Sequence, residues 1–231
     1  MTTSPATRTA RTTEQAPVVV AAGLHLAYGT TPVLTDTSLT VGPGAELALT
    51  GRSGSGKTTL LLALAGLLKP ERGSIRWPGL EADPVLRRAQ IGLVFQAPSL
   101  LPELTAAENV ALPLRLRGSS VEHAGAATRA ALAVVDLLDA ADALPAQLSG
   151  GMQQRVAVAR VLAGTPRLVL ADEPTGALDR SSGFAVLTAL RDHVTAAGGA
   201  LVVATHDEEL AGLLADEAVL DAGRLRMGAR S

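Results

Sequence analysis

The sequence predicts an α/β fold whose core is a mainly parallel sheet. Short apolar strand patterns alternate with stretches of helical apolar spacing, and this alternation is typical of parallel strands connected by helices. Two glycine-rich turns, at 51–56 and 149–151, each precede such a helical stretch. The 231 residues suffice for one domain, with or without an inserted subdomain, and for a sizeable core.

The individual elements follow from the apolar patterns. Strands are expected at 18–26, 46–50, 91–95, 168–171 and 200–205. Helices are expected at 57–68, 152–163 and 182–195. Residues 97–148 interrupt the alternation with helical patterns, which predicts an inserted helical subdomain. The Thr-rich stretch 1–16 has no apolar segment, so we expect a disordered tail rather than a secretory signal, followed by one domain over 17–231.

Composition excludes several classes of protein. Apolar residues make up 47% of the chain and the mean hydropathy is +0.28, yet no uncharged apolar run reaches the length of about 18 residues that a membrane span needs. The longest candidate is broken by Asp136, Asp139 and Asp142. A net charge of −2 argues against nucleic acid as a partner. Cysteine is absent, so no disulfide or thiolate metal site is possible, and this fits the cytosol.

A phosphate-binding loop is predicted between the strand at 46–50 and the helix at 57–68. Residues 51–58 match the pattern G-x-x-x-x-G-K-[ST], which requires a preceding strand and a following helix. Glycines let backbone N–H groups surround phosphate, and the helix adds its positive N-terminal dipole. The alternative, an ordinary glycine-rich turn, is disfavoured because the chain has only two lysines. The expected nucleotide-binding residues are Gly51, Arg52, Ser53, Gly54, Ser55, Gly56, Lys57, Thr58 and Thr59.

Two adjacent carboxylates end the apolar strand at 168–171. A buried strand would deliver Asp172 to the sheet edge where the phosphate loop lies, so that Asp172 and the Thr58 hydroxyl can hold Mg²⁺. Glu173 is then the candidate general base for a hydrolytic water, because Asp172 is engaged with the metal. The alternative is an acidic turn without a catalytic role.

A second anion site is predicted at the turn that opens the helix at 152–163. Ser149 and the N–H groups of Gly150 and Gly151 stand at a helix start, in the octet LSGGMQQR. One chain thus has two phosphate-binding helix starts. Both can serve one nucleotide if two subunits pack head to tail.

From about 18 to 227 the chain resembles an ABC-type ATPase. The resemblance implies a P-loop NTPase core with a mainly parallel sheet, a small antiparallel β subdomain and an inserted α-helical subdomain. It implies that Gln96 contacts Mg²⁺ or the attacking water, that His206 contacts the γ-phosphate, and that Tyr28 stacks on adenine. Residues 177–179 are similar to the loop that meets a partner subunit. The alternatives are an ordinary histidine at 206 and a core-edge aromatic at 28.

A narrower resemblance rests on residues 101–114 and 171–179. These are similar to the exporter branch that includes lipoprotein-release, macrolide-export and cell-division ATPases, whose permeases often transmit mechanical work. Two departures stand out. Arg52 occupies a position where Pro is frequent, and its side chain is expected to point outward. The stretch 73–89 looks shorter than usual, which leaves the outline of the antiparallel subdomain open.

These observations predict the ATP-hydrolysing subunit of a transporter. Two chains, identical or different, would close on two ATP molecules with Mg²⁺, at the cytoplasmic face of the membrane, beside a transmembrane permease. One alternative is a soluble ABC protein of translation or DNA repair. Such proteins have two linked cassettes or a long coiled coil, whereas this sequence has one cassette and no heptad run. Another is a P-loop kinase, which the octet at 148–155 disfavours. The apolar stretch 110–116 is expected either to dock the permease or to pack in the core.

Overall fold

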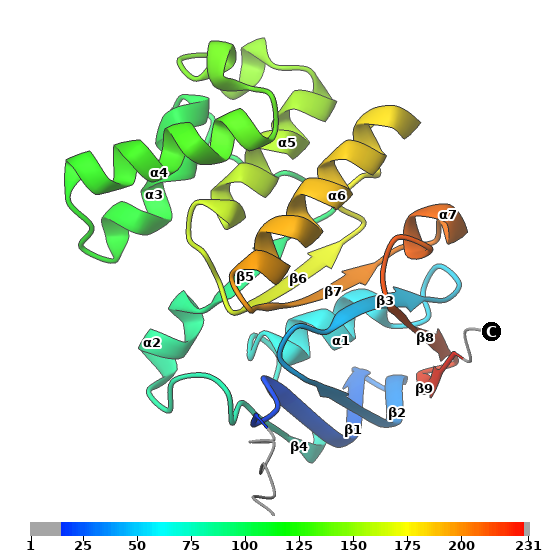
Figure 1. Ribbon diagram of the computed structural model, residues 1–231. Coiled ribbons are helices and arrows are strands. Elements are labelled where there is room, and N and C mark those ends of the chain that lie inside the picture. Colours follow the sequence, from blue (N-terminus) through cyan, green and yellow to red (C-terminus); the bar gives the residue numbers. More distant parts are fainter. Residues whose placement is uncertain (1–14, 229–231) are drawn as a thin grey trace, which may run out of the picture.

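A computed structural model describes residues 15–228 and contains a six-stranded sheet with the order β5-β6-β7-β3-β8-β9 (Figure 1). Every neighbouring pair is parallel except β8 and β9. The mainly parallel sheet predicted from the sequence is therefore confirmed. Most of the predicted tail lies outside the described residues. The strands are β3 (Glu46–Thr50), β5 (Ile91–Val94), β6 (Leu168–Asp172), β7 (Ala200–Ala204), β8 (Asp216–Asp221) and β9 (Arg224–Met227).

A smaller antiparallel sheet packs beside the first. Its strand order is β2-β1-β4, from β1 (Val19–Tyr28), β2 (Thr31–Val41) and β4 (Arg72–Arg76). The outline of this subdomain, which the sequence left open, is thus completed by β4. A short helix, α2 (Pro84–Ala89), follows it and leads into β5.

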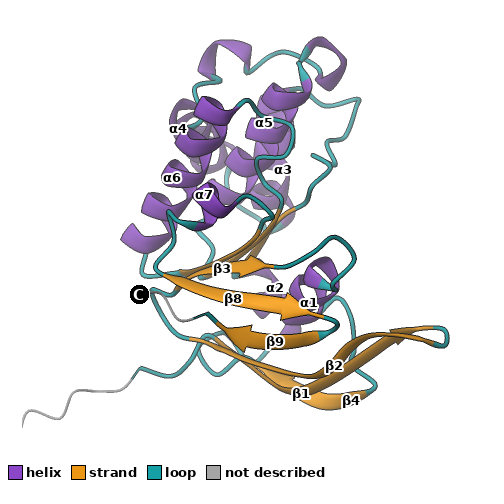
Figure 2. Cartoon of the chain, turned by 90° about the vertical axis from the view of Figure 1, so that its right-hand side faces the viewer, coloured by secondary structure: helices purple, strands orange, loops and turns teal. Residues whose placement is uncertain are grey.

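Helices cover the six-stranded sheet on both faces (Figures 1 and 2). Helix α1 (Lys57–Leu64) packs on the face shared with the small sheet, and α5 (Gly150–Leu162) and α6 (Arg180–Ala196) cover the other. Between β5 and α5 the chain forms α3 (Ala106–Leu116), α4 (Val121–Val134) and two 3-10 turns, and α7 (Glu208–Ala211) follows β7. Within residues 15–228, no helix has the length and apolar character needed to cross a bilayer.

The two faces are filled by alternate residues of the same strands. In β3, Leu47 and Leu49 join the core around α1, whereas Ala48 joins the core under α5 and α6. Successive side chains of a strand point to opposite faces, so a strand buried on both faces is continuously apolar. All five residues of β6 and of β7 are buried for this reason.

Helix α1 ends at Leu64, four residues before the predicted end. Gly66 has φ +74°, its N–H bonds to the Ala63 carbonyl, and the Leu67 N–H bonds to the Leu62 carbonyl at 2.9 Å. This pair of bonds is a Schellman motif, which ends helices at a glycine. The predicted helix was too long because the apolar pattern continues to residue 68, beyond the motif that ends the helix.

Of the two outcomes expected for 110–116, packing in the core holds for Val110 and Leu114, so a docking role is wrong for these two residues. Val110 is fully buried and Leu114 is 7% exposed, and both pack in the core with Ala106. Residues four apart share one face of a helix, so 106, 110 and 114 point inward together. Leu116 lies off this face and is 79% exposed.

Candidate nucleotide site

The loop between β3 and α1 adopts a conformation that requires glycine at two positions. Gly51 has φ +141°, and a Cβ atom there would lie 2.2 Å from the Leu220 carbonyl oxygen. Gly56 has φ +103°, and its Cβ would lie 3.0 Å from the Val33 carbonyl oxygen. Only a residue without a side chain fits such close approach in this backbone region. The loop thus leads directly into the N-terminus of α1, which favours an anion.

Lys57, the first residue of α1, turns back over this loop. Its Nζ donates to the Gly51 carbonyl at 2.8 Å and to the Arg52 carbonyl at 3.3 Å. The residue is 9% exposed and lines the pocket above the loop. An ammonium has three donors, so a phosphate oxygen could replace or join these carbonyl acceptors.

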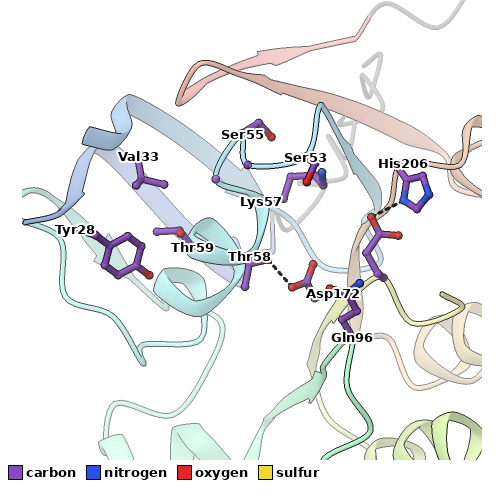
Figure 3. A pocket seen from close by; sticks show the side chains of 13 residues that line it. Tyr28, Val33, Ser53, Ser55, Lys57, Thr58, Thr59, Gln96, Asp172 and His206 are labelled. Carbon is purple, nitrogen blue, oxygen red and sulfur yellow. Dashed lines mark hydrogen bonds and ion pairs between the residues drawn. The ribbon is translucent and has the colours of Figure 1, made fainter. Parts of the chain in front are cut away.

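Thr58 and Asp172 connect α1 to the end of β6. The Thr58 hydroxyl donates to Asp172 Oδ2 at 2.6 Å, and Asp172 is 8% exposed (Figure 3). Gln96, which follows β5, lines the same pocket. Hydroxyl, carboxylate and amide oxygens are the hard donors that Mg²⁺ prefers, usually together with substrate phosphates. Among residues 15–228 there is no group of three or more His, Cys, Asp or Glu side chains that could hold a metal ion.

Glu173 leaves the strand in an unusual conformation. Its φ is +47°, a left-handed value that costs an L-residue about 1–2 kcal/mol. Its N–H bonds to the Ala204 carbonyl of β7 at 2.9 Å, and its carboxylate oxygen Oε1 lies 2.8 Å from His206 Nδ1. Strain of this kind clusters at functional sites. Here it turns the carboxylate from the strand axis into the pocket.

These side chains line one pocket with a volume of about 520 Å³. Tyr28 and Val33 lie at one end, Lys57 in the middle, and Asp172, Gln96 and His206 at the other end (Figure 3). Tyr28 is 58% exposed, so it is not a core-edge aromatic. The lining residues are Tyr28, Val33, Ser53, Gly54, Ser55, Gly56, Lys57, Thr58, Thr59, Gln96, Asp172, Glu173 and His206.

Val33 is the lining residue that the sequence analysis missed. It belongs to β2, whose Thr- and Ser-rich pattern gave no clear strand signal. Two predicted residues, Gly51 and Arg52, do not line the pocket and contribute their carbonyls to Lys57 instead. The Arg52 residue is exposed, in agreement with the outward direction expected for its side chain.

The second predicted anion site lies apart from this pocket. Ser149 caps α5 by accepting the Met152 N–H at 3.2 Å, and neither Ser149, Gly150 nor Gly151 lines the pocket. A Cβ at Gly151 would lie 3.1 Å from a Leu178 methyl carbon, so this turn touches the loop at 177–179 of the same chain. The chain thus presents two helix starts at separate places.

Asp179 closes the loop that follows Glu173 and caps α6. The Ser181 hydroxyl, the Ser182 N–H and the Ser182 hydroxyl all donate to its carboxylate. These hydrogen bonds, the one from Ser181 foremost, hold the pKa of Asp179 well below its ordinary value. The carboxylate is therefore ionised at neutral pH and holds the loop at 177–179 against the start of α6.

A glycine-rich phosphate cradle, a lysine at the helix start and a carboxylate bonded to the adjacent threonine define a P-loop nucleoside triphosphatase. The sequence model of the ABC transporter family matches residues 34–176. The lipoprotein-releasing system ATP-binding protein LolD of Shewanella oneidensis is 42% identical over 205 residues, which is 86% of this chain and 89% of the relative. LolD 2 of Caulobacter vibrioides is 41% identical over 222 residues, or 91% and 97% of the two chains.

A solved structure gives the same result. The ATP-binding cassette MJ0796, a dimer in a post-hydrolysis state bound to ADP and Pi, superimposes with a TM-score of 0.82 at 35% identity. The match covers 92% of this chain and 99% of the cassette. The chain belongs to the ABC transporter family, as an ATP-binding subunit with ATPase activity.

Proposed function

We propose that this ATP-binding subunit hydrolyses ATP in the pocket above the loop at 51–56 and powers a separate membrane permease. The observation that carries the proposal is the pair Asp172 and Glu173. One carboxylate is bonded to Thr58, and the next is turned into the pocket and bonded to His206. Two adjacent carboxylates in such different surroundings can take different roles, one beside a metal and one as a base.

The phosphates of ATP would be bound by the loop. Backbone N–H groups of Ser53 to Thr59 at the start of α1 suit oxygen anions, and the Lys57 ammonium would exchange its carbonyl partners for the β- and γ-phosphates. Mg²⁺, when bound, would neutralise phosphate charge, with Thr58, Asp172 and Gln96 as the residues that hold it. Tyr28, exposed at the far end of the pocket beside Val33, would stack on the adenine.

Hydrolysis would need one proton transfer by this chain. Glu173 would accept a proton from water as the water oxygen bonds to the γ-phosphorus, and the bond from that phosphorus to the bridging oxygen would break, giving ADP and phosphate. The side chain of Glu173 is 13% exposed, and this burial limits the access of bulk water to its carboxylate. His206 would orient Glu173 and donate a hydrogen bond toward the γ-phosphate.

The turn at Ser149–Gly151 is proposed to serve the nucleotide of a second subunit. It is a capped helix start outside the pocket of its own chain, and the related cassette of known structure is a dimer. With two chains packed head to tail, each ATP would be bound by Lys57 of one chain and Ser149 of the other. Closure would depend on ATP binding the closed dimer better than ADP does.

The partner is proposed to be a permease of the export or mechanical type, with this subunit on its cytoplasmic side. The support is the similarity to LolD, whose name assigns it to a lipoprotein-releasing system. The chain is proposed to form one domain over 17–231, with a helical subdomain over about 97–148. A cavity of about 130 Å³ between the start of β5, the end of α3 and the end of α5, lined by Pro113 and Arg117, is the proposed docking groove. The exposed Leu116 directly precedes Arg117 in the chain.

The direct test of the proposed reaction is phosphate release by the purified chain with Mg·ATP and no acceptor substrate. We expect steady release of one phosphate per ADP formed. A P-loop kinase, the competing reaction class, would instead need an acceptor molecule. Absence of phosphate release in the presence of a folded, ATP-binding chain would contradict the proposal.

A further inference from the structure

The segment that carries Gln96 into the pocket is irregular. Strand β5 ends at Val94 and the next helix begins at Ala106. Within the segment Ser99 has φ +52°, a left-handed conformation that is unfavourable for serine, and its hydroxyl donates to the Ala97 carbonyl at 3.1 Å. A segment of this kind keeps one conformation only when its surroundings hold it.

Helix α5 holds this segment on both sides of Gln96. Gln154 Nε2 donates to the Phe95 carbonyl at 3.1 Å. Six residues along the same helix, Arg160 donates through Nη1 to the Ser99 carbonyl at 2.9 Å and through Nη2 to the Pro98 carbonyl at 3.1 Å. The acceptors are backbone atoms on either side of Gln96, so the bonds fix the path of the chain.

The two donors are committed to these contacts. Gln154 is fully buried, and its Oε1 has no hydrogen-bond partner within the described chain, so Nε2 alone anchors the amide. Burial lowers the pKa of Arg160, and none of the ion pairs within residues 15–228 includes it. The carbonyls of Pro98 and Ser99 are therefore the acceptors that its guanidinium uses.

The same helix begins at the Ser149 turn. Gln154 lies four residues after Gly150, which is about one helical turn. The contact with Phe95 is thus close to the turn proposed to bind the nucleotide of the other subunit. Figure 1 shows α5 packed between the helical subdomain and α6, so the helix that carries both donors is held on two sides.

We propose that Gln154 and Arg160 are positioning residues: their bonds to the backbone on either side of Gln96 fix the place of the Gln96 side chain in the pocket. The inference rests on the proposed function, because it takes Gln96 as the residue that meets Mg²⁺ or the attacking water. A merely structural role for these bonds would instead predict lost stability with no special dependence on Gln96.

The test uses Gln154→Met and Arg160→Met, each in the wild-type chain and in a Gln96→Ala chain. Methionine keeps the length of glutamine and removes the donor, and since Oε1 has no partner, only the bond to Phe95 is lost. The control is Thr128→Val in α4, because Thr128 is buried and its hydroxyl also lacks a partner within the described chain. Steady-state ATPase kinetics and equilibrium ATP binding are measured for every variant, with thermal unfolding to confirm folding.

We expect each variant to lower kcat about tenfold or more, as small displacements of reacting groups do, with ATP affinity little changed. In the Gln96→Ala chain the same substitutions should have no further effect, because both act through Gln96. Arg160→Lys keeps the charge and one donor nitrogen, so it should recover part of kcat. If Arg160→Met does not fold, Arg160→Lys takes its place in the test.

Unchanged kcat for both variants, beside a defective Gln96→Ala chain, would overturn this inference and leave the proposed function standing. Losses that add fully to that of Gln96→Ala would overturn it as well. Normal turnover by Gln96→Ala alone would contradict the role proposed for Gln96, and the inference would fall with it.

Discussion

His206 Nδ1 lies 2.8 Å from Glu173 Oε1, at the ends of two neighbouring parallel strands. The histidine side chain is 76% exposed and the glutamate side chain only 13%. Glu173, the proposed base, is thus shielded inside the pocket, whereas His206 lies at the entrance of the pocket.

Glu173→Gln should bind Mg·ATP and hydrolyse it poorly. The amide keeps the size of the side chain and loses the base, so we expect kcat to fall by about 10²- to 10⁴-fold. Phosphate release and equilibrium ATP binding measure the two effects. Glu217→Gln, which changes a carboxylate that accepts the Thr50 hydroxyl outside the pocket, should stay near the wild-type rate. Normal turnover by Glu173→Gln would remove Glu173 from the mechanism.

Lys57→Ala should weaken ATP binding, because hydrogen bonds to charged groups contribute about 1.5–3 kcal/mol each, or roughly 10- to 150-fold in affinity. Lys57→Arg should also fail, because the planar guanidinium does not fit a loop that encloses a point charge between the Gly51 and Arg52 carbonyls. Lys69→Arg, at the other and exposed lysine, is the matched control. An active Lys57→Arg enzyme would contradict this account of the loop.

Thr58→Val should raise the Mg²⁺ concentration needed for half-maximal ATPase activity, by about tenfold or more for one lost charge-assisted contact. Valine preserves shape but removes the hydroxyl that lies 2.6 Å from Asp172. Thr195→Val removes a similar bond, to Glu46 at 3.0 Å, outside the pocket. The titration should be unchanged for Thr195→Val, and an equal shift in both variants would mean that Thr58 has no special role toward Mg²⁺.

Leu116→Asp should uncouple the subunit from its permease while its basal ATPase activity is kept. Leu116 is exposed and directly precedes Arg117, which lines the proposed groove, so we expect an added charge to disturb docking and not the core. The measurement is the amount of an integral membrane protein that is purified together with the full-length chain from detergent-solubilised membranes. The wild type should retain this protein at a fixed stoichiometry. The control, Leu86→Asp at an exposed residue of α2, should retain it equally. Retention by Leu116→Asp would refute this site.

The sequence predicted the residues of the nucleotide pocket better than it predicted the surface that docks a partner. The residues at 51–58, Asp172 and Glu173 are local signals, since each combines a strand end with a required residue type. Val33 carried no such signal, because it enters the pocket only through the pairing of β2 with β1. Leu114 lies four residues after Val110, and this spacing places both side chains on one helix face, which favours the core-packing alternative for these two residues.

The contacts of α5 with the Gln96 segment could not be predicted from sequence. Gln154 and Phe95 are 59 residues apart, and their bond depends on how α5 packs on β5. Glutamine and arginine in a helix are ordinarily solvated, and the acceptors are carbonyls that any residue supplies. Only the tertiary structure identifies them.

The most direct test of the central claim is a mixing experiment between Lys57→Ala and Ser149→Arg subunits. Each homodimer should be inactive, because every site would lack either the lysine or the open helix start. A mixed dimer would have one site with both lesions and one with neither. We predict recovered ATPase activity on mixing, in step with the fraction of mixed dimers measured by native mass spectrometry. No recovery, with mixed dimers present, would contradict a nucleotide site shared between two chains.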